Sequence, residues 1–402
     1  MHFPAGGKLV EDLQELELLA TSAGALVVAT VTGARTTPES KYFVGTGKAE
    51  EIRDAVAAHH ADLVLFNHTL SPAQERNLEK LFNCRVLDRN GLILDIFAQR
   101  ARSFEGKLQV ELALLKHLST RLVRGWTHLE RQRGGIGLRG PGETQLETDR
   151  RLIRARIQLI TKRLAKLRKQ REQSRRARKK ARVPTVALVG YTNAGKSTLF
   201  NRLTGAAVYV ADQLFATLDP TLRRVSFPET GPIILADTVG FIRHLPPTLI
   251  AAFHATLEEV TEADLILHVI DLHDDDRDMH AEQVEAVLQS LEADTVPRLR
   301  VYNKIDLHTG LQPSLDRDSA GTIKQVLVSA ATGFGMAELV SAMGEFLNKE
   351  MIECHVLLPS EDARLRADLY ERGAVLAETV TEDGGWDLLV RISRAEAEAR
   401  KK

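Results

Sequence analysis

Thr185-Val-Ala-Leu-Val189 and Gly190-Tyr-Thr-Asn-Ala-Gly-Lys-Ser197 are adjacent in the chain and together predict its architecture. The first run reads as a buried strand, and a helix is expected to begin near Ser197. Between them, glycines let backbone N–H groups turn inward around phosphate oxygens, and the helix dipole adds to the attraction. The alternative is a chance glycine-containing turn. It is disfavoured because the strand, the turn, the helix and the Gly-Lys-Ser sequence occur together. The stretch predicts an α/β fold with a phosphate-binding loop (P-loop).

Two side chains at the end of this loop have predicted chemical roles. Lys196 is expected to reach the β- and γ-phosphates of a nucleotide, and the Ser197 hydroxyl is expected to bind Mg²⁺. The other loop positions are expected to contact the phosphates: Gly190, Tyr191, Thr192, Asn193, Ala194 and Gly195.

Three short motifs follow in order, each after a predicted strand, where sheets of this kind bind ligands. Asp237 is expected to lie next to Mg²⁺ without binding it directly, and the Gly240 N–H is expected to donate to the γ-phosphate. Asp306 can accept hydrogen bonds from N1–H and N2–H of guanine, which adenine lacks, so discrimination of about 10⁴ or more is expected. The Ala330 N–H can reach guanine O6. The motifs comprise Asp237, Thr238, Val239, Gly240, Asn303, Lys304, Ile305, Asp306, Ser329, Ala330 and Ala331, and predict a P-loop GTPase domain.

Phe215-Ala-Thr-Leu-Asp-Pro220 has the position of a switch segment. Such a segment needs a threonine hydroxyl that completes Mg²⁺ coordination when the γ-phosphate is present. Thr217 is the predicted ligand, and Thr221 is the alternative. Lys196, Thr217 and Gly240 are the predicted catalytic residues. The segment residues expected near GTP are Phe215, Ala216, Thr217, Leu218 and Asp219.

The residue after Gly240 departs from the Ras-like pattern. Ras-like proteins place a glutamine there to orient the attacking water, whereas this chain has Phe241. Hydrolysis is therefore expected to be slow alone, or to be completed by another group or a partner. The loop resembles that of potassium-stimulated GTPases, in which the residue matching Asn193 helps to hold K⁺. The alternative is that Asn193 only braces the loop.

Length and composition set wide bounds on the rest. The chain has 402 residues, which suggests two to four domains. Hydrophobic residues make up 44% and charged residues 27%, as in globular proteins. No apolar run approaches the roughly 20 residues of a membrane span. Cys84 and Cys354 are the only cysteines, so a disulfide framework is excluded and a cytoplasmic location is expected.

The segments around the GTPase domain have their own patterns. Residues 1–106 alternate strands, expected at 25–30, 62–66 and 84–88, with helices at 48–59 and from Pro72, where Ser71 suits an N-cap; this predicts a small parallel α/β domain. Residues 107–182 show apolar residues at 3/4 spacing on both sides of a glycine-rich stretch, which predicts a long antiparallel helical hairpin. Residues 183–347 form the GTPase domain, and 348–402 are expected to form a small C-terminal α+β domain.

One arm of the hairpin is strongly basic. From Arg150 to Arg182 there are 16 Lys or Arg residues and one acid, while the rest of the chain holds 38 basic and 53 acidic residues. Such density favours a polyanion contact over a solvated face. The tip, Gly134-Gly-Ile-Gly-Leu-Arg-Gly-Pro-Gly142, permits close approach to a nucleic-acid backbone; a floppy loop is the alternative. The predicted RNA-binding residues are Arg131, Arg133, Arg139, Arg175, Arg176, Lys179 and Lys180.

With these motifs in place, the sequence resembles the bacterial HflX family of GTPases. The resemblance spans nearly the whole chain, and the residues after Met351 are the least distinctive. It is carried by Lys41-Tyr-Phe-Val-Gly45, Gly134-Gly-Ile-Gly-Leu-Arg-Gly-Pro-Gly-Glu-Thr-Gln-Leu-Glu147, the P-loop, Phe215–Pro220 and Asp237-Thr-Val-Gly-Phe-Ile242.

The resemblance implies binding to the large ribosomal subunit and its RNA, and splitting of stalled or idle ribosomes. GTP and GDP are the implied nucleotides, with Mg²⁺ as cofactor, and we expect a monomer. The family is also reported to bind ATP at its N-terminal domain, for which Gly45-Thr-Gly-Lys48 is the only local candidate, although these residues favour a plain strand–helix turn. Two other classes remain open, a GTP-switched partner in RNA modification and a nucleotide-gated protein scaffold.

Overall fold

The computed structural model describes residues 9–125, 141–180, 183–206, 214–215, 217–243, 257, 259–319, 321–347, 351–371, 374–381 and 383–393. Two compact units emerge from its contacts. Unit 1 takes the described residues of Met1–Arg168 and Asp212–Leu218, and unit 2 takes those of Lys169–Ala211, Asp219–Leu245 and His254–Lys402. None of the helices among these residues is long and apolar enough to cross a membrane.

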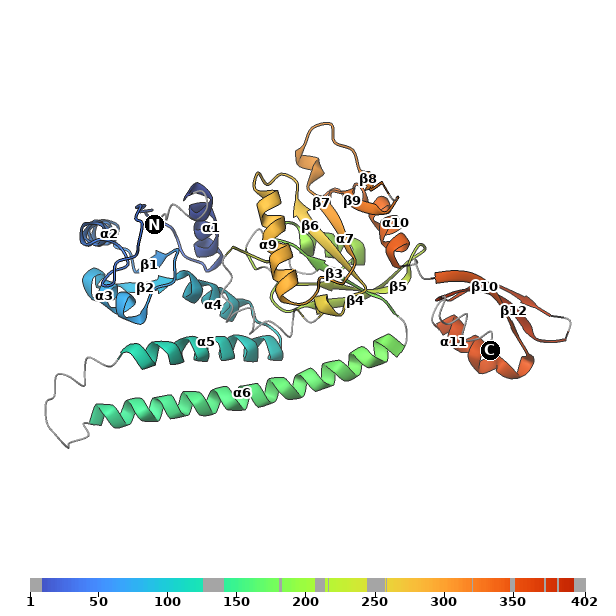
Figure 1. Ribbon diagram of the computed structural model, residues 1–402, viewed down its shortest axis with the longest axis horizontal. Coiled ribbons are helices and arrows are strands. Elements are labelled where there is room, and N and C mark those ends of the chain that lie inside the picture. The colour runs from blue at the N-terminus through green and yellow to red at the C-terminus, as the bar shows by residue number, and fades with distance from the viewer. Residues whose placement is uncertain are drawn as a thin grey trace. The chain divides into compact units, whose positions relative to one another are not determined.

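Unit 1 begins with a small α/β fold (Figure 1). Its elements are α1 (Leu9–Ser22), α2 (Thr46–His59), β1 (Leu63–Phe66), α3 (Pro72–Phe82), β2 (Arg85–Asp88) and α4 (Arg89–Arg100). β1 and β2 pair in parallel, as the sequence predicted. Ser71 caps α3 in a reciprocal capping box with Gln74, and Pro72 occupies the first turn.

The prediction of a strand at residues 25–30 was wrong. These residues form neither helix nor strand, and Leu26 is 86% exposed. An apolar run can border a cavity as well as pair in a sheet, and periodicity does not separate the two. Here the run lines a pocket beside β1.

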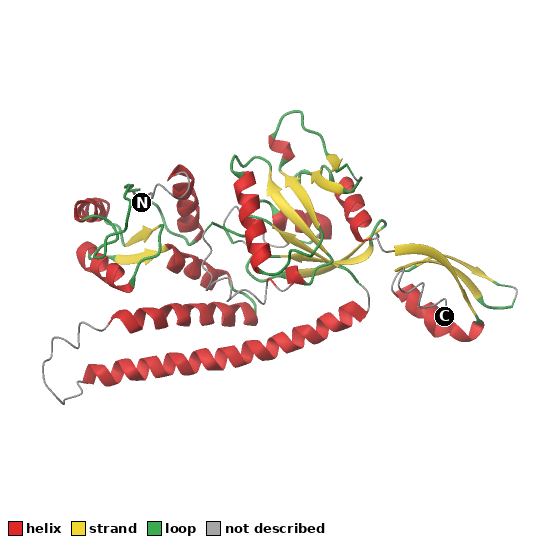
Figure 2. Ribbon diagram, in the orientation of Figure 1, coloured by secondary structure: helices red, strands yellow, loops and turns green. Residues whose placement is uncertain are grey.

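The helical hairpin is present. α5 (Phe104–Gly125) packs along α6 (Pro141–Lys180) in the antiparallel arrangement visible in Figure 2. Leu108, Leu112 and Ile160 are buried at the seam, and Arg156 donates two hydrogen bonds to Glu111. The 40 residues of α6 correspond to about 60 Å of helix. Residues 126–140, most of the tip, lie outside the described residues.

Unit 2 contains a seven-stranded sheet in the order β4-β5-β3-β6-β7-β9-β8. Five central strands run parallel, and β4 and β8 pair antiparallel at the two edges. The strands are β3 (Thr185–Val189), β4 (Thr221–Phe227), β5 (Gly231–Asp237), β6 (Leu265–Asp271), β7 (Arg298–Asn303), β8 (Ser314–Arg317) and β9 (Ile323–Leu327). Strand β8 was not anticipated.

The sheet is covered by α7 (Lys196–Thr204), α9 (Arg277–Ser290) and α10 (Met336–Leu347). One apolar core joins side chains from the strands, such as Leu188 and Leu267, to Phe200 of α7 and Met343 of α10. Since β3 lies between β5 and β6, its carboxyl end is a point where successive connections diverge. Ligands bind at such points in open α/β sheets.

The last part of the chain is the expected small α+β fold. It comprises β10 (Met351–Leu358), a short 3₁₀ turn at Ser360–Asp362, α11 (Ala363–Glu371), β11 (Val375–Val380) and β12 (Trp386–Ser393). Another 3₁₀ turn, Ile305–Leu307, follows β7 in the GTPase sheet. The three strands pair antiparallel in the order β10-β12-β11. Leu358, Leu369, Leu388 and Val390 form its core.

Candidate functional site

The P-loop connects β3 to α7, and two of its glycines are required by close approach. A Cβ on Gly190 would lie 2.2 Å from the Val269 carbonyl oxygen, and one on Gly195 would lie 2.2 Å from Nδ2 of Asn303. Gly195 also has φ +91°, which side chains other than glycine rarely adopt. The predicted strand–loop–helix is confirmed, and its backbone curves tightly against β6 and β7.

Lys196 is buried at the first turn of α7. Its Nζ donates to the Tyr191 carbonyl oxygen over 2.6 Å. Burial lowers the pKa of Lys196 to about 8, although the nearby Asp237 carboxylate pulls it upward. Phosphate oxygens would favour the charged form, so this amine is suited to an anionic ligand.

Ser197 and Asp237 meet at the carboxyl ends of β3 and β5. The Ser197 hydroxyl donates to Oδ2 of Asp237 over 2.7 Å, and Asp237 is fully buried. Thr238 fixes the end of β5 by donating to the Leu188 carbonyl oxygen over 2.6 Å. A hydroxyl and a carboxylate at the mouth of a phosphate loop are oxygen donors of the kind that Mg²⁺ accepts, so the residues fit that ion.

Asn303 joins the P-loop to the last motif. Its Nδ2 donates to the Ala194 carbonyl oxygen over 2.9 Å, and its Oδ1 accepts from the Ala330 N–H over 2.9 Å. Lys304, in the left-handed region at φ 68°, forms an ion pair with Asp271 over 2.6 Å. Motifs that lie more than a hundred residues apart are thereby held together in unit 2.

Asp306 presents its carboxylate at the surface, next to Ser329. The Ser329 hydroxyl donates to Oδ1 of Asp306 over 2.5 Å, which orients the carboxylate. Ala330 is buried and Ala331 is exposed. The structure brings Asp306 and Ser329 together, as a guanine site requires. The Ala330 N–H, the predicted donor to guanine O6, is buried and donates to Asn303, so its role at guanine stays a prediction.

Sequence reasoning missed Arg202 of α7. Its Nε donates to the Ala330 carbonyl oxygen over 3.1 Å, and Nη2 contacts the Ala331 carbonyl oxygen. It braces the loop that follows β9. One arginine among 54 basic residues carries no sequence signal of such a role. Arg243, Asp274 and His280, which lie beside Tyr191, were missed for the same reason.

Phe241 is buried and paired with the P-loop through its backbone. Its N–H donates to the Gly190 carbonyl oxygen over 3.2 Å, and its carbonyl oxygen accepts from the Thr192 N–H over 2.8 Å. Asn193 has φ 61°, a conformation that asparagine tolerates better than most residues. Local backbone geometry is thus a sufficient reason for asparagine at that position.

The switch segment is placed differently from the other motifs. Its described residues up to Leu218 group with unit 1, whereas Ser197 and Asp237 belong to unit 2. The ring of Phe215 meets that of Phe97 edge-on at 4.6 Å, and the Leu214 N–H donates to Oγ of Ser22 over 3.0 Å. Ala216 lies outside the described residues. The Mg²⁺ role of Thr217 stays a prediction.

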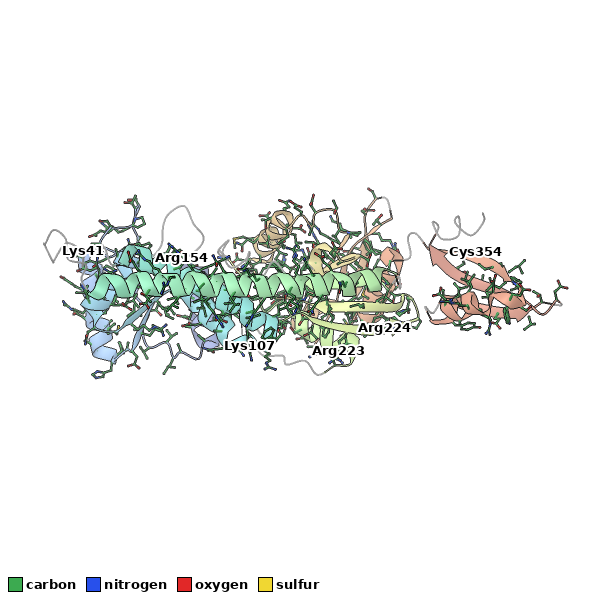
Figure 3. All side chains as sticks on the ribbon, turned by 90° about the horizontal axis from the view of Figure 1, so that it is seen from below. Lys41, Lys107, Arg154, Arg223, Arg224 and Cys354 are labelled. Carbon is green, nitrogen blue, oxygen red and sulfur yellow. The ribbon has the colours of Figure 1, made fainter. Side chains whose placement is uncertain are left out.

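The basic arm is mostly exposed where its side chains are described, with Arg150 and Arg171 half-buried. Arg154 of α6 points outward in Figure 3, and exposed lysines and arginines continue to Lys169. The α6 backbone carries Arg175, Arg176, Lys179 and Lys180, whose side chains lie outside the described residues. Arg131, Arg133 and Arg139 lie outside them altogether.

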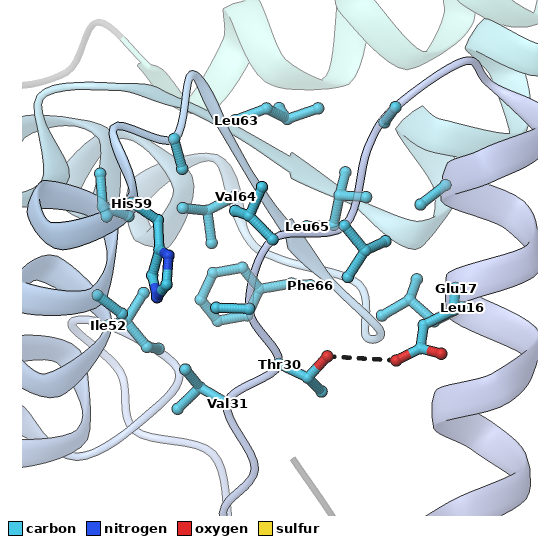
Figure 4. A pocket seen from close by; sticks show the side chains of 18 of the residues that line it. Leu16, Glu17, Thr30, Val31, Ile52, His59, Leu63, Val64, Leu65 and Phe66 are labelled. Atoms are coloured by element: carbon cyan, nitrogen blue, oxygen red, sulfur yellow. Dashed lines mark hydrogen bonds between the residues drawn. The ribbon is translucent and has the colours of Figure 1, made fainter.

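Unit 1 holds a pocket of about 540 Å³ beside β1, shown in Figure 4. Apolar side chains such as Ile52, Val64 and Phe66 line it, and Thr30 donates to Glu17 at its rim over 3.2 Å. Lys48 also lines it and forms an ion pair with Glu51 over 2.7 Å. The Gly45-Thr-Gly-Lys48 segment is a loop–helix junction, with Gly45 at an ordinary φ of −65°.

Comparisons with known proteins agree with this geometry. Four family models match in succession: "GTP-binding GTPase N-terminal" at 10–98, "GTP-binding GTPase Middle Region" at 100–178, "50S ribosome-binding GTPase" at 185–304 and "HflX C-terminal domain" at 315–402. GTPase HflX of Escherichia coli K12 is 59% identical over 96% of this chain and 90% of its own length.

The chain belongs to the HflX family of GTPases. A second HflX relative, from Magnetococcus marinus, is 49% identical over 92% of this chain and 86% of its own length. Among solved structures, a GTP-binding protein from the archaeon Sulfolobus solfataricus in complex with GDP is 24% identical, with a TM-score of 0.44, over 84% of this chain and 96% of that one. Membership in the HflX family establishes GTP binding and GTP hydrolysis as the activity, as the motifs predicted.

Proposed function

We propose that this HflX-family GTPase binds the large ribosomal subunit and splits stalled or idle ribosomes. The observation that carries the proposal is the long exposed basic helix α6, joined directly to a GTPase domain whose family model is described as ribosome-binding. Phosphate groups of ribosomal RNA would neutralise like charges that otherwise repel one another along one helix.

Contacts within unit 2 support the nucleotide roles that we propose for most of these residues. Lys196 and the P-loop amides hold the phosphates, and Asp306 reads guanine. Asn303 links the P-loop to the loop after β9, and the Ala330 N–H, which donates to Oδ1 of Asn303, must leave that acceptor to reach guanine O6. Ser197 is the Mg²⁺ ligand, with Asp237 behind it and Thr217 as the further ligand. When bound, Mg²⁺ neutralises phosphate charge.

Hydrolysis by the isolated protein is expected to be weak, because Phe241 has no polar group to orient a water molecule. We propose that ribosomes complete the site. We also propose K⁺ at Asn193, so replacing K⁺ by Na⁺ should slow hydrolysis, and Asn193→Ala should remove the difference. ATP at the N-terminal domain and the domain borders at 106/107, 182/183 and 347/348 are further proposals.

Co-sedimentation tests the ribosome proposal. The full chain is centrifuged with isolated large and small subunits in the presence of a non-hydrolysable GTP analogue, GDP or neither. Binding to large subunits that needs the GTP analogue and weakens with salt is expected. Binding to neither subunit, together with normal GTP hydrolysis, would leave the GTPase in place and remove the ribosome from its function.

A further inference from the structure

The loop after β5 is paired with the P-loop through two backbone hydrogen bonds, from Phe241 N–H to Gly190 and from Thr192 N–H to Phe241. This pairing presses Gly240 against the phosphate loop. A Cβ on Gly240 would lie 2.8 Å from Cγ2 of Thr192 and 3.0 Å from Nζ of Lys196. Lys196 and the Gly240 N–H are the two groups assigned to the γ-phosphate, and here Gly240 packs closely against Thr192 and Lys196.

Side chains fasten the same loop. The backbone N–H of Arg243 donates to the hydroxyl oxygen of the Tyr191 side chain over 2.8 Å. The Arg243 guanidinium is 5% exposed and lies between Nε2 of His280, at 3.1–3.2 Å, and Oδ2 of Asp276, at 3.4 Å. The imidazole of His280 stacks on the Tyr191 ring, with centroids 3.9 Å apart and an interplanar angle of 16°.

The orientation of His280 follows from its second partner. Nδ1 lies 2.5 Å from Oδ2 of Asp274, and a carboxylate accepts, so Nδ1 carries the proton. Nε2 of the neutral ring is then an acceptor, and it accepts a hydrogen bond from Nε–H of the Arg243 guanidinium. Asp274 thus orients the His280 ring, and His280 in turn accepts from the Arg243 guanidinium.

We propose that Arg243, His280 and Asp274 determine the preference between GTP and GDP by latching Gly240 and Phe241 onto the P-loop. This inference rests on the proposed nucleotide site and adds a selectivity mechanism to it. GDP needs only the P-loop and the guanine contacts, which the latch leaves in place. GTP binding must first separate Gly240 from Lys196, and the latch opposes that movement.

The size of the effect follows from population-shift arithmetic. If the latched form is about 90–99% populated, GTP binds roughly 10–100-fold more weakly than it would to the open form, while GDP affinity is unchanged. Breaking the latch should therefore lower the Kd for a GTP analogue by about tenfold or more. A merely structural brace would instead weaken both nucleotides and lower the melting temperature.

The test measures the Kd values of fluorescent GDP and a fluorescent non-hydrolysable GTP analogue for the full-length protein. Arg243→Met keeps the aliphatic stem and removes the guanidinium. His280→Phe keeps the stack on Tyr191 and removes the acceptor. Arg277→Met is the matched control. Arg277 lies on α9, the helix that carries His280, and its guanidinium donates to the Leu272 carbonyl oxygen instead of contacting Arg243 or His280 in the bonds described above.

Stronger binding of the GTP analogue to Arg243→Met and His280→Phe, with unchanged GDP binding and an unaffected control, supports the latch. If the ratio of the Kd for the GTP analogue to the Kd for GDP is the same in these variants and in the unmodified protein, the latch is rejected. Should either variant melt early, Tyr191→Phe, which removes only the hydroxyl acceptor, must shift the ratio in the same direction or the latch is rejected. Failure of the unmodified protein to bind guanine nucleotides at this site would instead contradict the site assignment.

Discussion

The Ser197 hydroxyl donates a hydrogen bond to the Asp237 carboxylate over 2.7 Å, and so joins the first turn of α7 to the end of β5. The two residues lie 40 positions apart in the chain and meet only because β3 and β5 pair in parallel, with Leu188 opposite Asp237. The strand register therefore positions the proposed Mg²⁺ site.

Ser197→Ala and Asp237→Ala should both weaken Mg²⁺-dependent hydrolysis, but to different degrees. Ser197→Ala removes a proposed ligand. Asp237→Ala removes the group that orients it, a change that typically costs about 10–100-fold in metal affinity. Hydrolysis measured against Mg²⁺ concentration should show a raised half-saturation point in both variants, with the larger shift in Ser197→Ala. Unshifted curves in both would place the metal elsewhere.

Asp306→Asn should change the base that is read. The asparagine amide NH2 would face the guanine 2-amino group with a donor, which costs about 10⁴-fold or more in sites of this kind, whereas xanthine carries a C2 oxygen in place of that amino group. The Ser329 hydrogen bond to Oδ1 can persist, so the loop itself is expected to stay folded. Competition between GTP and xanthosine triphosphate is the measurement. Retention of GTP affinity by the variant would show that another group reads the base.

Much of this site was predictable because its motifs are short, local and linked to strand ends. The strands that carry Asp237 and Asn303 and the strand before Gly190 were all expected. Arg202 and the Arg243–His280 pair were not, because their roles depend on contacts between segments 37 to 129 residues apart. The same reason explains the error at 25–30, since no local pattern says whether an apolar run finds a neighbouring strand.

Nucleotide binding should take up a proton at alkaline pH. In the structure burial holds the pKa of Lys196 near 8, and phosphate oxygens would raise it on binding. Below pH 7 the amine is charged in both states, so Lys196 adds no pH dependence to binding. Above pH 8 the free protein must first gain the proton, and affinity should fall about tenfold per pH unit until the pKa of the bound state is reached. Calorimetry at pH 8.5 in two buffers of different ionisation enthalpy measures the uptake.

Lys196→Arg is the control for that titration. Arginine stays charged throughout this range, so the proton uptake should vanish even if its affinity differs from that of lysine. Uptake that persists in Lys196→Arg would assign the proton to another group.

The hairpin seam should depend on Ile160 and not on its neighbour. Ile160 is fully buried against Leu108 and Leu112, so Ile160→Ala should cost about 2–5 kcal/mol of local stability. Leu159, 42% exposed, is the matched control, and Leu159→Ala should change stability by no more than about 0.5 kcal/mol. Hydrogen exchange of the α5 and α6 amides measures both. Equal protection in the two variants would contradict this packing.

Ribosome splitting should require the hairpin tip, and ribosome binding should require the basic arm. A helix of about 60 Å can carry the glycine-rich segment into a ribonucleoprotein, where phosphate neutralisation supplies affinity that falls with salt. Deleting Gly134–Gly142 should therefore leave GTP binding intact and abolish splitting, as followed by light scattering of intact ribosomes. Charge reversal at Arg175, Arg176, Lys179 and Lys180 should weaken binding and reduce the salt slope by about 0.7–0.9 for each lost phosphate contact. Normal splitting by the deletion variant would contradict this role of the tip, and the GTPase surface and the C-terminal strands would be the next parts of the chain to test for the splitting element.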